Sequence, residues 1–135
     1  MDKIIIDAEG IPRGRIASYV AKIALGGKEV AIINSEKAII SGADKSNISD
    51  FKRLRALNTI KPEKGPFFSK STEKIMKRTI RGMLPDFRRG KGKEAWRRIK
   101  CYNGIPGEFK HEKAIKPELH KPEKFITIKE LSDRA

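Results

Sequence analysis

A short glycine- and arginine-containing turn has the residue types of a phosphate site. Gly10 to Gly14 lies between an apolar segment and a helical one, where glycines let a phosphate approach the helix N-terminus. The spacing matches neither GxGxxG nor GxxxxGK[ST], so a tight turn is the favoured interpretation. Arg13 and Arg15, at the positive end of that helix, nevertheless suit one backbone phosphate of RNA.

Other reactive side chains lack the partners that catalysis needs. His111 and His120 have no Ser, Cys or Asp at a recognisable catalytic spacing, and we interpret them as surface residues. Asp7 and Glu9 follow a strand into a turn, where Asp7 is expected to accept bonds from turn amides. Cys101 is the one cysteine and has no CxxC partner, so a buried core position is favoured. We therefore expect no enzyme activity, no cofactor and no metal.

Positive charge is concentrated in the middle of the chain. The 135 residues carry a formal net charge of +14, and residues 52–100 hold 17 basic and 4 acidic side chains. Residues 1–51 hold 7 of each, and residues 101–135 hold 7 and 6. Such an excess repels itself in a compact fold unless a polyanion neutralises it. Nucleic acid is favoured over general solubility, and over a membrane surface because the basic stretch lacks an apolar helix face.

Length and composition indicate one domain in a reducing compartment. A chain of this size is long enough for one compact core and short for two. It has no apolar run of roughly 18 residues, and acids interrupt its start too early for a signal peptide. We expect a cytoplasmic protein with no membrane segment and no small-molecule substrate.

The elements that must position the candidate residues begin with a strand, a helix and a strand. Lys3 to Asp7 is a β-branched run, and from Arg15 apolar residues recur at helical spacing until a glycine pair. Glu29 to Asn34 contains an unalternated apolar run, typical of a strand covered on both faces. A third apolar patch follows at residues 38–40. The order predicts an α/β fold.

Two further helices are expected to carry much of the charge. One spans about residues 48–57, and residues 59–69 then form an extended loop. The other runs from Thr72 to about Leu84, with Ser71 as its cap and Pro85 as its end. Four cations share one stripe of this second helix: Lys74, Lys77, Arg78 and Arg81. Four apolar residues form another stripe: Met76, Ile80, Met83 and Leu84.

The last third of the domain combines a basic loop with a final strand. Residues 88–93 alternate cations and glycines, which predicts a flexible phosphate-binding loop. A short helix over residues 94–98 then leads to the last core strand at 99–102. Trp96 and Tyr102 favour core positions, whereas Phe67 and Phe68 suit a loop or stacking on RNA bases equally well. Residues 107–135 are expected to form an extension laid over a domain of residues 1–106.

The candidate RNA contacts are basic residues throughout these elements. They are Arg13, Arg15, Lys37, Arg53, Arg55, Lys70, Lys74, Lys77, Arg78, Arg81, Arg88, Arg89, Lys91, Lys93, Arg97 and Arg98.

Four blocks, in this order, resemble one family, the universal large-subunit ribosomal protein number thirteen. They are DAEG with GRIA in residues 7–17, INSEK running to SG in 33–42, RGMLP in 81–85 and KCYNG in 100–104. In the last block, Cys101 replaces a usual aliphatic residue. GPFF at 65–68 and GIP at 104–106 further resemble the archaeal and eukaryotic branch.

The resemblance implies a three-layer α/β/α domain with a four-stranded, mainly parallel sheet. It also implies a non-catalytic protein that organises large-subunit ribosomal RNA beside neighbouring ribosomal proteins. RNA contact carries over only to basic residues in or beside the matching blocks, namely Arg15, Lys37 and Arg81. Two rival hypotheses remain: a nucleotide-binding enzyme that uses the strand-glycine-helix opening, and a DNA-binding regulator, which no helix-turn-helix or zinc pattern favours.

Overall fold

The computed structural model describes residues 3–57, 68–109, 114–117 and 122–134. Along the chain the elements, with η for a 3-10 turn, are β1 (Lys3–Asp7), α1 (Arg13–Leu25), β2 (Glu29–Ile33), η1 (Ser35–Lys37), β3 (Ile39–Ser41), α2 (Asp44–Arg55), α3 (Thr72–Arg81), α4 (Gly90–Arg98), β4 (Ile99–Cys101), η3 (Gly107–Phe109), β5 (Phe125–Thr127) and α5 (Ile128–Arg134). The strand, helix and strand predicted at the start of the chain are confirmed, and the fold is mixed α/β.

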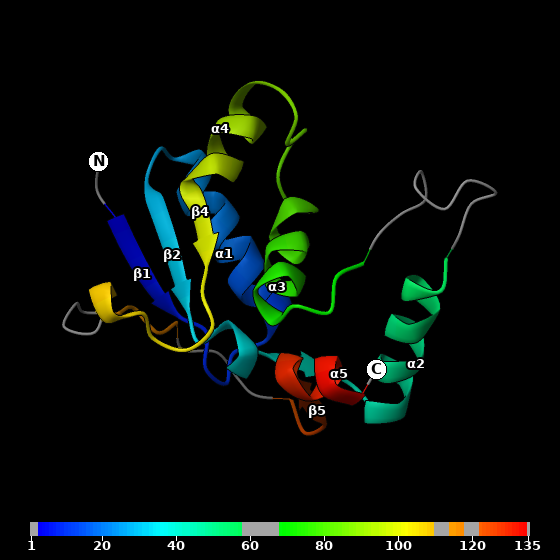
Figure 1. Cartoon of the computed structure of the whole chain (residues 1–135). Helices are drawn as coiled ribbons and strands as arrows, with labels where there is room; N and C mark the ends of the chain where they lie inside the picture. Colours follow the sequence, from blue (N-terminus) through cyan, green and yellow to red (C-terminus); the bar gives the residue numbers. More distant parts are fainter. Residues whose placement is uncertain (1–2, 58–67, 110–113, 118–121, 135) are drawn as a thin grey trace.

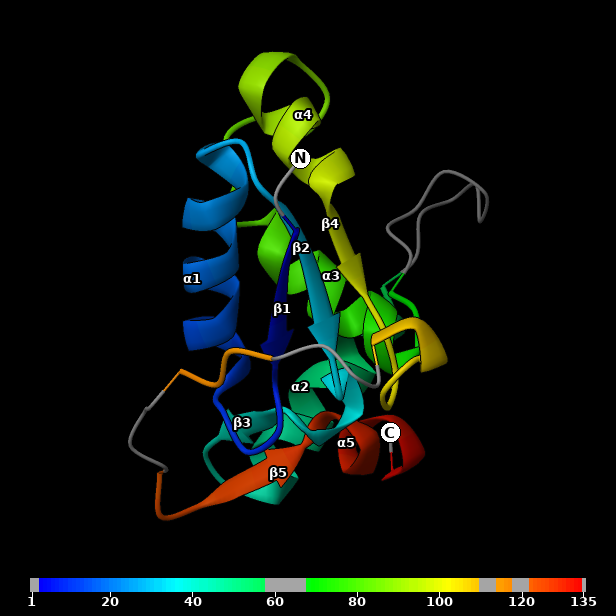
Figure 2. The same ribbon diagram turned by 90° about the vertical axis from the view of Figure 1, so that its left-hand side faces the viewer.

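The central sheet is parallel and has the strand order β1-β2-β4 (Figure 2). Ile32 of β2 lies beside Ile6 of β1 and Cys101 of β4. Four strands were expected, and that number is wrong for the described residues, because β3 pairs antiparallel with β5 in a separate sheet. After β2 the chain turns at Asn34, whose φ is a left-handed 55°, and η1 then carries it away from the central sheet before β3 begins.

The two faces of the central sheet are covered differently. Ile6, Ile32 and Ile99 belong to a core shared with α1, α3 and α4, which all lie on one face (Figures 1 and 2). Ile5 and the other residues of the opposite face pack against Phe109 of η3, with Tyr102 and Ala114 beside it. The second helical layer that the resemblance implied is not seen among the described residues.

The C-terminal segment supplies a strand and a helix to the same molecule. β5 pairs with β3, and its Ile126 is fully buried, as is Ile128 at the start of α5. Since β5 follows β4 in the chain, the expectation that residues 99–102 form the last core strand is wrong. This second sheet, with α2 and α5, lies beyond the carboxyl ends of the parallel strands (Figures 1 and 2).

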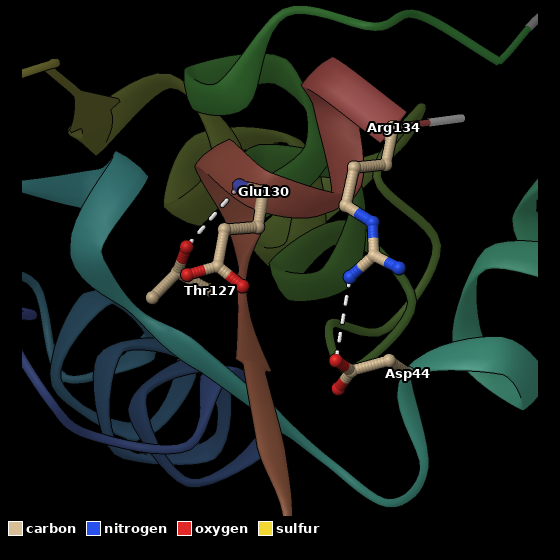
Figure 3. A network of polar contacts seen from close by, with 4 residues as sticks. All are labelled: Asp44, Thr127, Glu130 and Arg134. Atoms are coloured by element: carbon tan, nitrogen blue, oxygen red, sulfur yellow. Dashed lines mark hydrogen bonds and ion pairs between the residues drawn. The ribbon is translucent and has the colours of Figure 1, made fainter.

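Polar contacts fix the ends of α5 (Figure 3). The Glu130 amide donates to the Thr127 hydroxyl over 3.1 Å, so Thr127 caps the helix. At the other end, the Arg134 guanidinium lies 3.3 Å from the Asp44 carboxylate in the first turn of α2. The end of the C-terminal helix therefore lies beside the start of α2.

The flexible basic loop predicted for residues 88–93 is wrong, because α4 begins at Gly90. Gly92 is buried, and a Cβ on it would lie 2.3 Å from the Pro85 carbonyl oxygen and 2.4 Å from that of Asp86. The glycine is therefore a packing residue, which lets α4 approach the preceding turn closely.

The helix predicted over 72–84 is present but ends at Arg81. The Met83 and Leu84 amides bond to the carbonyls three residues earlier, so the chain tightens into a turn before Pro85. Met76 and Ile80 of the predicted apolar stripe are buried, and Leu84 is half-buried. Met83 is 45% exposed, so its place in that stripe is wrong.

Candidate nucleic-acid interface

The cationic stripe of α3, Lys74, Lys77, Arg78 and Arg81, lies partly on aromatic rings. Lys74 is exposed, while the other three residues are half-buried. The centroid distances are 4.6 Å from Lys77 Nζ to Trp96, 3.9 Å from Arg78 Cζ to Phe68 and 4.8 Å from Arg81 Cζ to Phe87. Attraction to the ring faces holds these cations in defined positions. The α3 stripe is therefore organised by the fold before any ligand binds.

The aromatic rings come from chain segments before and after α3: Phe68 precedes the helix, and Phe87 and Trp96 follow it. Phe87 and Trp96 make an edge-to-face contact, with centroids 6.2 Å apart. Trp96 is half-buried beneath Lys77, so the predicted core position is only partly confirmed. Phe68 lies beside Arg78, and Phe67 lies outside the described residues. Sequence reasoning missed Phe87, although its place between two basic segments was a usable signal.

The predicted core role of Tyr102 is confirmed. Its ring meets Phe109 edge-on at 5.4 Å and covers the second face of the central sheet. Tyr102 therefore packs within the domain, whereas the rings around α3 lie under cations.

Helix α4 presents a second group of cations. Its exposed members and those just before it are Arg88, Arg89, Lys91, Lys93 and Arg97. Arg98 differs, since its Nη1 donates to the Ala24 carbonyl over 3.0 Å and its Nη2 lies 3.7 Å from Glu94. Ala24 is in the last turn of α1, where a cation also opposes the negative end of the helix dipole. Arg98 therefore has a structural role in joining α1 to α4.

The turn before α1 is built as the sequence predicted. Asp7 Oδ1 accepts bonds from the Glu9 amide at 3.0 Å and from Asn34 Nδ2 at 3.1 Å. Arg15 is exposed. Arg13 is half-buried, and the burial lowers the pKa of its guanidinium from the ordinary value. Within the described residues no hydrogen bond or ion pair to Arg13 is present.

The remaining candidates are exposed but spread over the molecule. Lys37 is in η1, Arg53 and Arg55 are in the last turn of α2, and Lys70 precedes α3. The structure does not gather all the predicted contacts into one patch. It gathers three of them, Arg13, Lys74 and Arg78, around a pocket.

This α2–α3 pocket has a volume of about 400 Å³. Its apolar lining includes Ile40, Phe51, Leu54, Ile75 and Leu131. Phe68 and Thr79 also line it, and Asp50 is the acidic residue among the described lining. Sequence reasoning missed the pocket because its lining comes from residues far apart in the chain.

A polar network holds the start of α3 against the loop after β4. The Thr72 hydroxyl donates to Asn103 Oδ1, and Asn103 Nδ2 donates to the Glu73 carboxylate. The next amide, that of Gly104, donates to the Glu36 carboxylate over 2.9 Å, and Gly104 has a φ of 65°. Asn103 of the KCYNG block thus ties the start of α3 to the loop after β4, and Gly104 ties the same loop to η1.

Cys101 fills the predicted buried core position only in part. It is half-buried at the edge of the main core, and burial raises the pKa of its thiol to about 12. The charge of Lys77 acts in the opposite direction, while Glu73 reinforces the increase. The described residues contain no acid, histidine or cysteine cluster suited to a metal ion, and no helix long and apolar enough to cross a membrane.

Comparison with known proteins decides the family. A family model described as ribosomal protein L13 matches residues 1–108, most of the chain. The chain belongs to the ribosomal protein L13 family. Large ribosomal subunit protein uL13 of Methanococcoides burtonii is 40% identical over 133 residues, which cover 95% of this chain and 94% of the relative.

Other members of the L13 family match over a similar length. The uL13 protein of Methanosarcina barkeri is 40% identical over 136 residues, covering 96% of this chain and 95% of the relative. That of Archaeoglobus fulgidus is 38% identical over 138 residues, covering 97% and 86%. The resemblance of the four sequence blocks to this family is confirmed, and the three relatives named here are archaeal.

Proposed function

We propose that this chain is a structural constituent of the large ribosomal subunit, where it binds and organises large-subunit ribosomal RNA and catalyses no reaction. The relatives are named as proteins of that subunit. The single observation in the structure that supports the proposal best is the α3 stripe, whose cations are held on aromatic rings. Its partners would be ribosomal RNA and neighbouring ribosomal proteins in the cytoplasm.

The proposed mechanism is a rigid scaffold that bridges phosphates. The α/β core fixes α3 and α4, so their cations meet RNA segments at set positions without a large ordering cost. Shape and 2′-hydroxyl contacts would outweigh base reading on paired RNA, because the bases of an A-form helix lie in a deep narrow groove. Cations on α3, α4 and the start of α1 would then clamp separate RNA segments together.

The candidate residues separate into three groups by structural setting. Exposed cations are the freest to reach phosphates: Arg15, Lys37, Arg53, Arg55, Lys70, Lys74, Arg89, Lys91, Lys93 and Arg97. Ring-backed cations offer fixed directions: Lys77, Arg78, Arg81 and the exposed Arg88, whose guanidinium lies 5.3 Å from the Phe87 centroid. Arg13 lines the α2–α3 pocket, and Arg98 joins two helices, so we expect Arg98 to contribute least to RNA affinity.

Salt dependence tests this proposal directly. If about six phosphates are neutralised, the logarithm of the association constant should fall with the logarithm of salt concentration with a slope near −5. Purified protein titrated against deproteinised large-subunit RNA at several salt concentrations gives this slope. A flat response would contradict the mechanism.

Competition separates the proposal from its two rivals. Excess duplex DNA should displace the RNA poorly, whereas a DNA-binding regulator would prefer the duplex. Calorimetry with ATP, GTP and dinucleotides should show no tight binding, because the turn before α1 lacks a phosphate-loop pattern. Co-sedimentation with large subunits from the same cell, maintained after a mild wash, completes the test.

A further inference from the structure

The α2–α3 pocket combines features that phosphate binding alone does not require. An exposed cation on a flat surface is sufficient to neutralise a phosphate. Here Arg13 is half-buried without a described partner, beside the buried side chains of Phe51, Ile75 and Leu131. A cation removed from water in apolar surroundings is costly unless an anion joins it. The pocket is therefore suited to a ligand with both an apolar and an anionic part.

One wall of the pocket is a contact between a guanidinium group and an aromatic ring. The Arg78 guanidinium carbon lies 3.9 Å from the centroid of the Phe68 ring, and both residues line the pocket. Aromatic rings and guanidinium planes are the surfaces on which unpaired RNA bases stack. The pocket lining also includes Leu54 and Phe51 of α2. Apolar and aromatic side chains beside a guanidinium group suit a flat, aromatic guest.

We propose that the α2–α3 pocket receives the base of one unstacked RNA nucleotide, whose phosphate contacts Arg13 and Lys74. This inference rests on the proposed function and specifies one part of it. The volume of about 400 Å³ is in the range of small-ligand sites and accepts a single base with its sugar, not a paired segment. Lys74 and Arg78 also belong to the α3 stripe, so the pocket is continuous with the proposed RNA surface.

Asp50 distinguishes a nucleotide from an acidic peptide as the occupant. Its carboxylate lines the same pocket. A carboxylate accepts hydrogen bonds from the amino groups of adenine, guanine or cytosine, whereas the side chains of an acidic peptide offer it no such donor. An acidic peptide would also leave the wall of Arg78 and Phe68 without a stacking partner. The combined chemistry favours a nucleotide.

A pair of matched substitutions tests the proposal. Leu54→Trp fills the pocket, whereas Leu57→Trp adds the same side chain at a 43% exposed position outside the pocket lining. Affinity for deproteinised large-subunit RNA is measured at fixed salt, and dimethyl sulfate probing reports the protection of single nucleotides. Leu54→Trp should weaken binding roughly tenfold and remove the protection of one nucleotide, because base stacking is lost. Leu57→Trp should change neither.

Two further variants keep the test decisive if Leu54→Trp does not fold. Phe68→Leu removes the planar surface and should abolish the same protection, while Phe68→Trp should preserve it. Unchanged protections in folded Leu54→Trp or Phe68→Leu protein would overturn the pocket proposal alone, with the steep salt response intact. Loss of RNA binding by the unmodified protein would instead overturn the proposed function.

Photo-crosslinking identifies the occupant itself. A Leu54→p-benzoylphenylalanine variant assembled into large subunits is irradiated, and the adducts are analysed. Adducts to one nucleotide of RNA are expected. Adducts only to a protein would overturn the nucleotide as the occupant.

Discussion

Close packing at the turn between α3 and α4 depends on a single residue, Gly92. The residue lies in a basic stretch, residues 88–93, that contains two glycines, which on sequence alone indicates flexibility. In the structure Gly92 is buried against the carbonyls of Pro85 and Asp86. The absence of a side chain is therefore required for close packing, and not for mobility.

The first prediction concerns this contact. Gly92→Ala should lower the free energy of unfolding by about 1–3 kcal/mol, because the new Cβ forces the backbone of α4 away from that turn. Urea denaturation measures the change. Gly14→Ala is the matched control, since it is also helical and its Cβ would meet nothing within 4 Å. It should be neutral or stabilise by up to about 1 kcal/mol. Equal losses in both variants would contradict the packing role.

The second prediction concerns the Cys101 thiol. Burial raises its pKa to about 12 in the folded protein, so the unreactive thiol form persists well above neutral pH. Iodoacetamide should alkylate the unfolded chain quickly at pH 9 and the native chain slowly. The unfolded thiol ionises at lower pH than the folded one, so this group should reduce stability as pH rises from about 9 to 12. Cys101→Ala should lack that part of the pH dependence. Fast native alkylation at pH 9 would contradict the assignment.

At the scale of the element, α3 combines packing and charge. Ile75, Met76 and Ile80 bury one side of the helix, and aromatic rings cover part of its cationic side. From the charge pattern alone, replacing all four stripe cations by glutamine is expected to leave the fold intact. The ring contacts revise that expectation, because each lost cation–π contact has a cost of its own.

The third prediction separates the two roles of the stripe. Lys77→Gln should lower the free energy of unfolding by about 0.5–1 kcal/mol through loss of its contact with Trp96. Lys74→Gln is the matched control, because Lys74 is exposed and no ring contact to it is present among the described residues. It should leave stability unchanged. Both variants should weaken RNA binding, since each removes one cation. Thermal denaturation and RNA titration of the two proteins give the comparison, and equal stabilities would contradict the ring contact.

At the scale of the whole molecule, the C-terminal segment contributes to the main hydrophobic core. Ile126, Ile128 and Leu131 belong to the same core as α1 and the central sheet. β5 pairs with β3, and α5 contacts both α2 and α3. The predicted division into residues 1–106 and 107–135 remains a prediction, but β5 and α5 share buried side chains with the earlier elements.

The fourth prediction tests this dependence. Ile128→Ala should lower the free energy of unfolding by about 2–5 kcal/mol, because Ile128 is fully buried. Phe125→Ala, three residues earlier at a 41% exposed position, should cost much less. Unfolding followed by circular dichroism and by Trp96 fluorescence should give one shared transition in each protein. A separate early transition in Ile128→Ala would show that the C-terminal segment folds independently.

The exposed ion pair at the end of α5 is expected to contribute little to this stability. Arg134 and Asp44 are both about half exposed, so solvent screens their attraction. Apolar burial, and not this pair, should hold the C-terminal segment in place.

The sequence by itself determined the local elements, the charge distribution and the family. β1, α1 and β2 follow from β-branched runs and helical spacing, which are short-range properties of the chain. The excess of cations in residues 52–100 and the KCYNG block are also visible in the sequence itself. Asp7 was correctly interpreted as the acceptor of its turn, because such bonds form between near neighbours.

Only the tertiary structure decided which distant residues meet. The pairing of β3 with β5 and the lining of the α2–α3 pocket join segments far apart in the chain, and the burial of Gly92 depends on how α4 packs against the turn before it. Local periodicity carries no information on such contacts, because they depend on how the elements pack. The rings on which Lys77, Arg78 and Arg81 lie belong to the same class, and they turn a run of charge into an ordered surface.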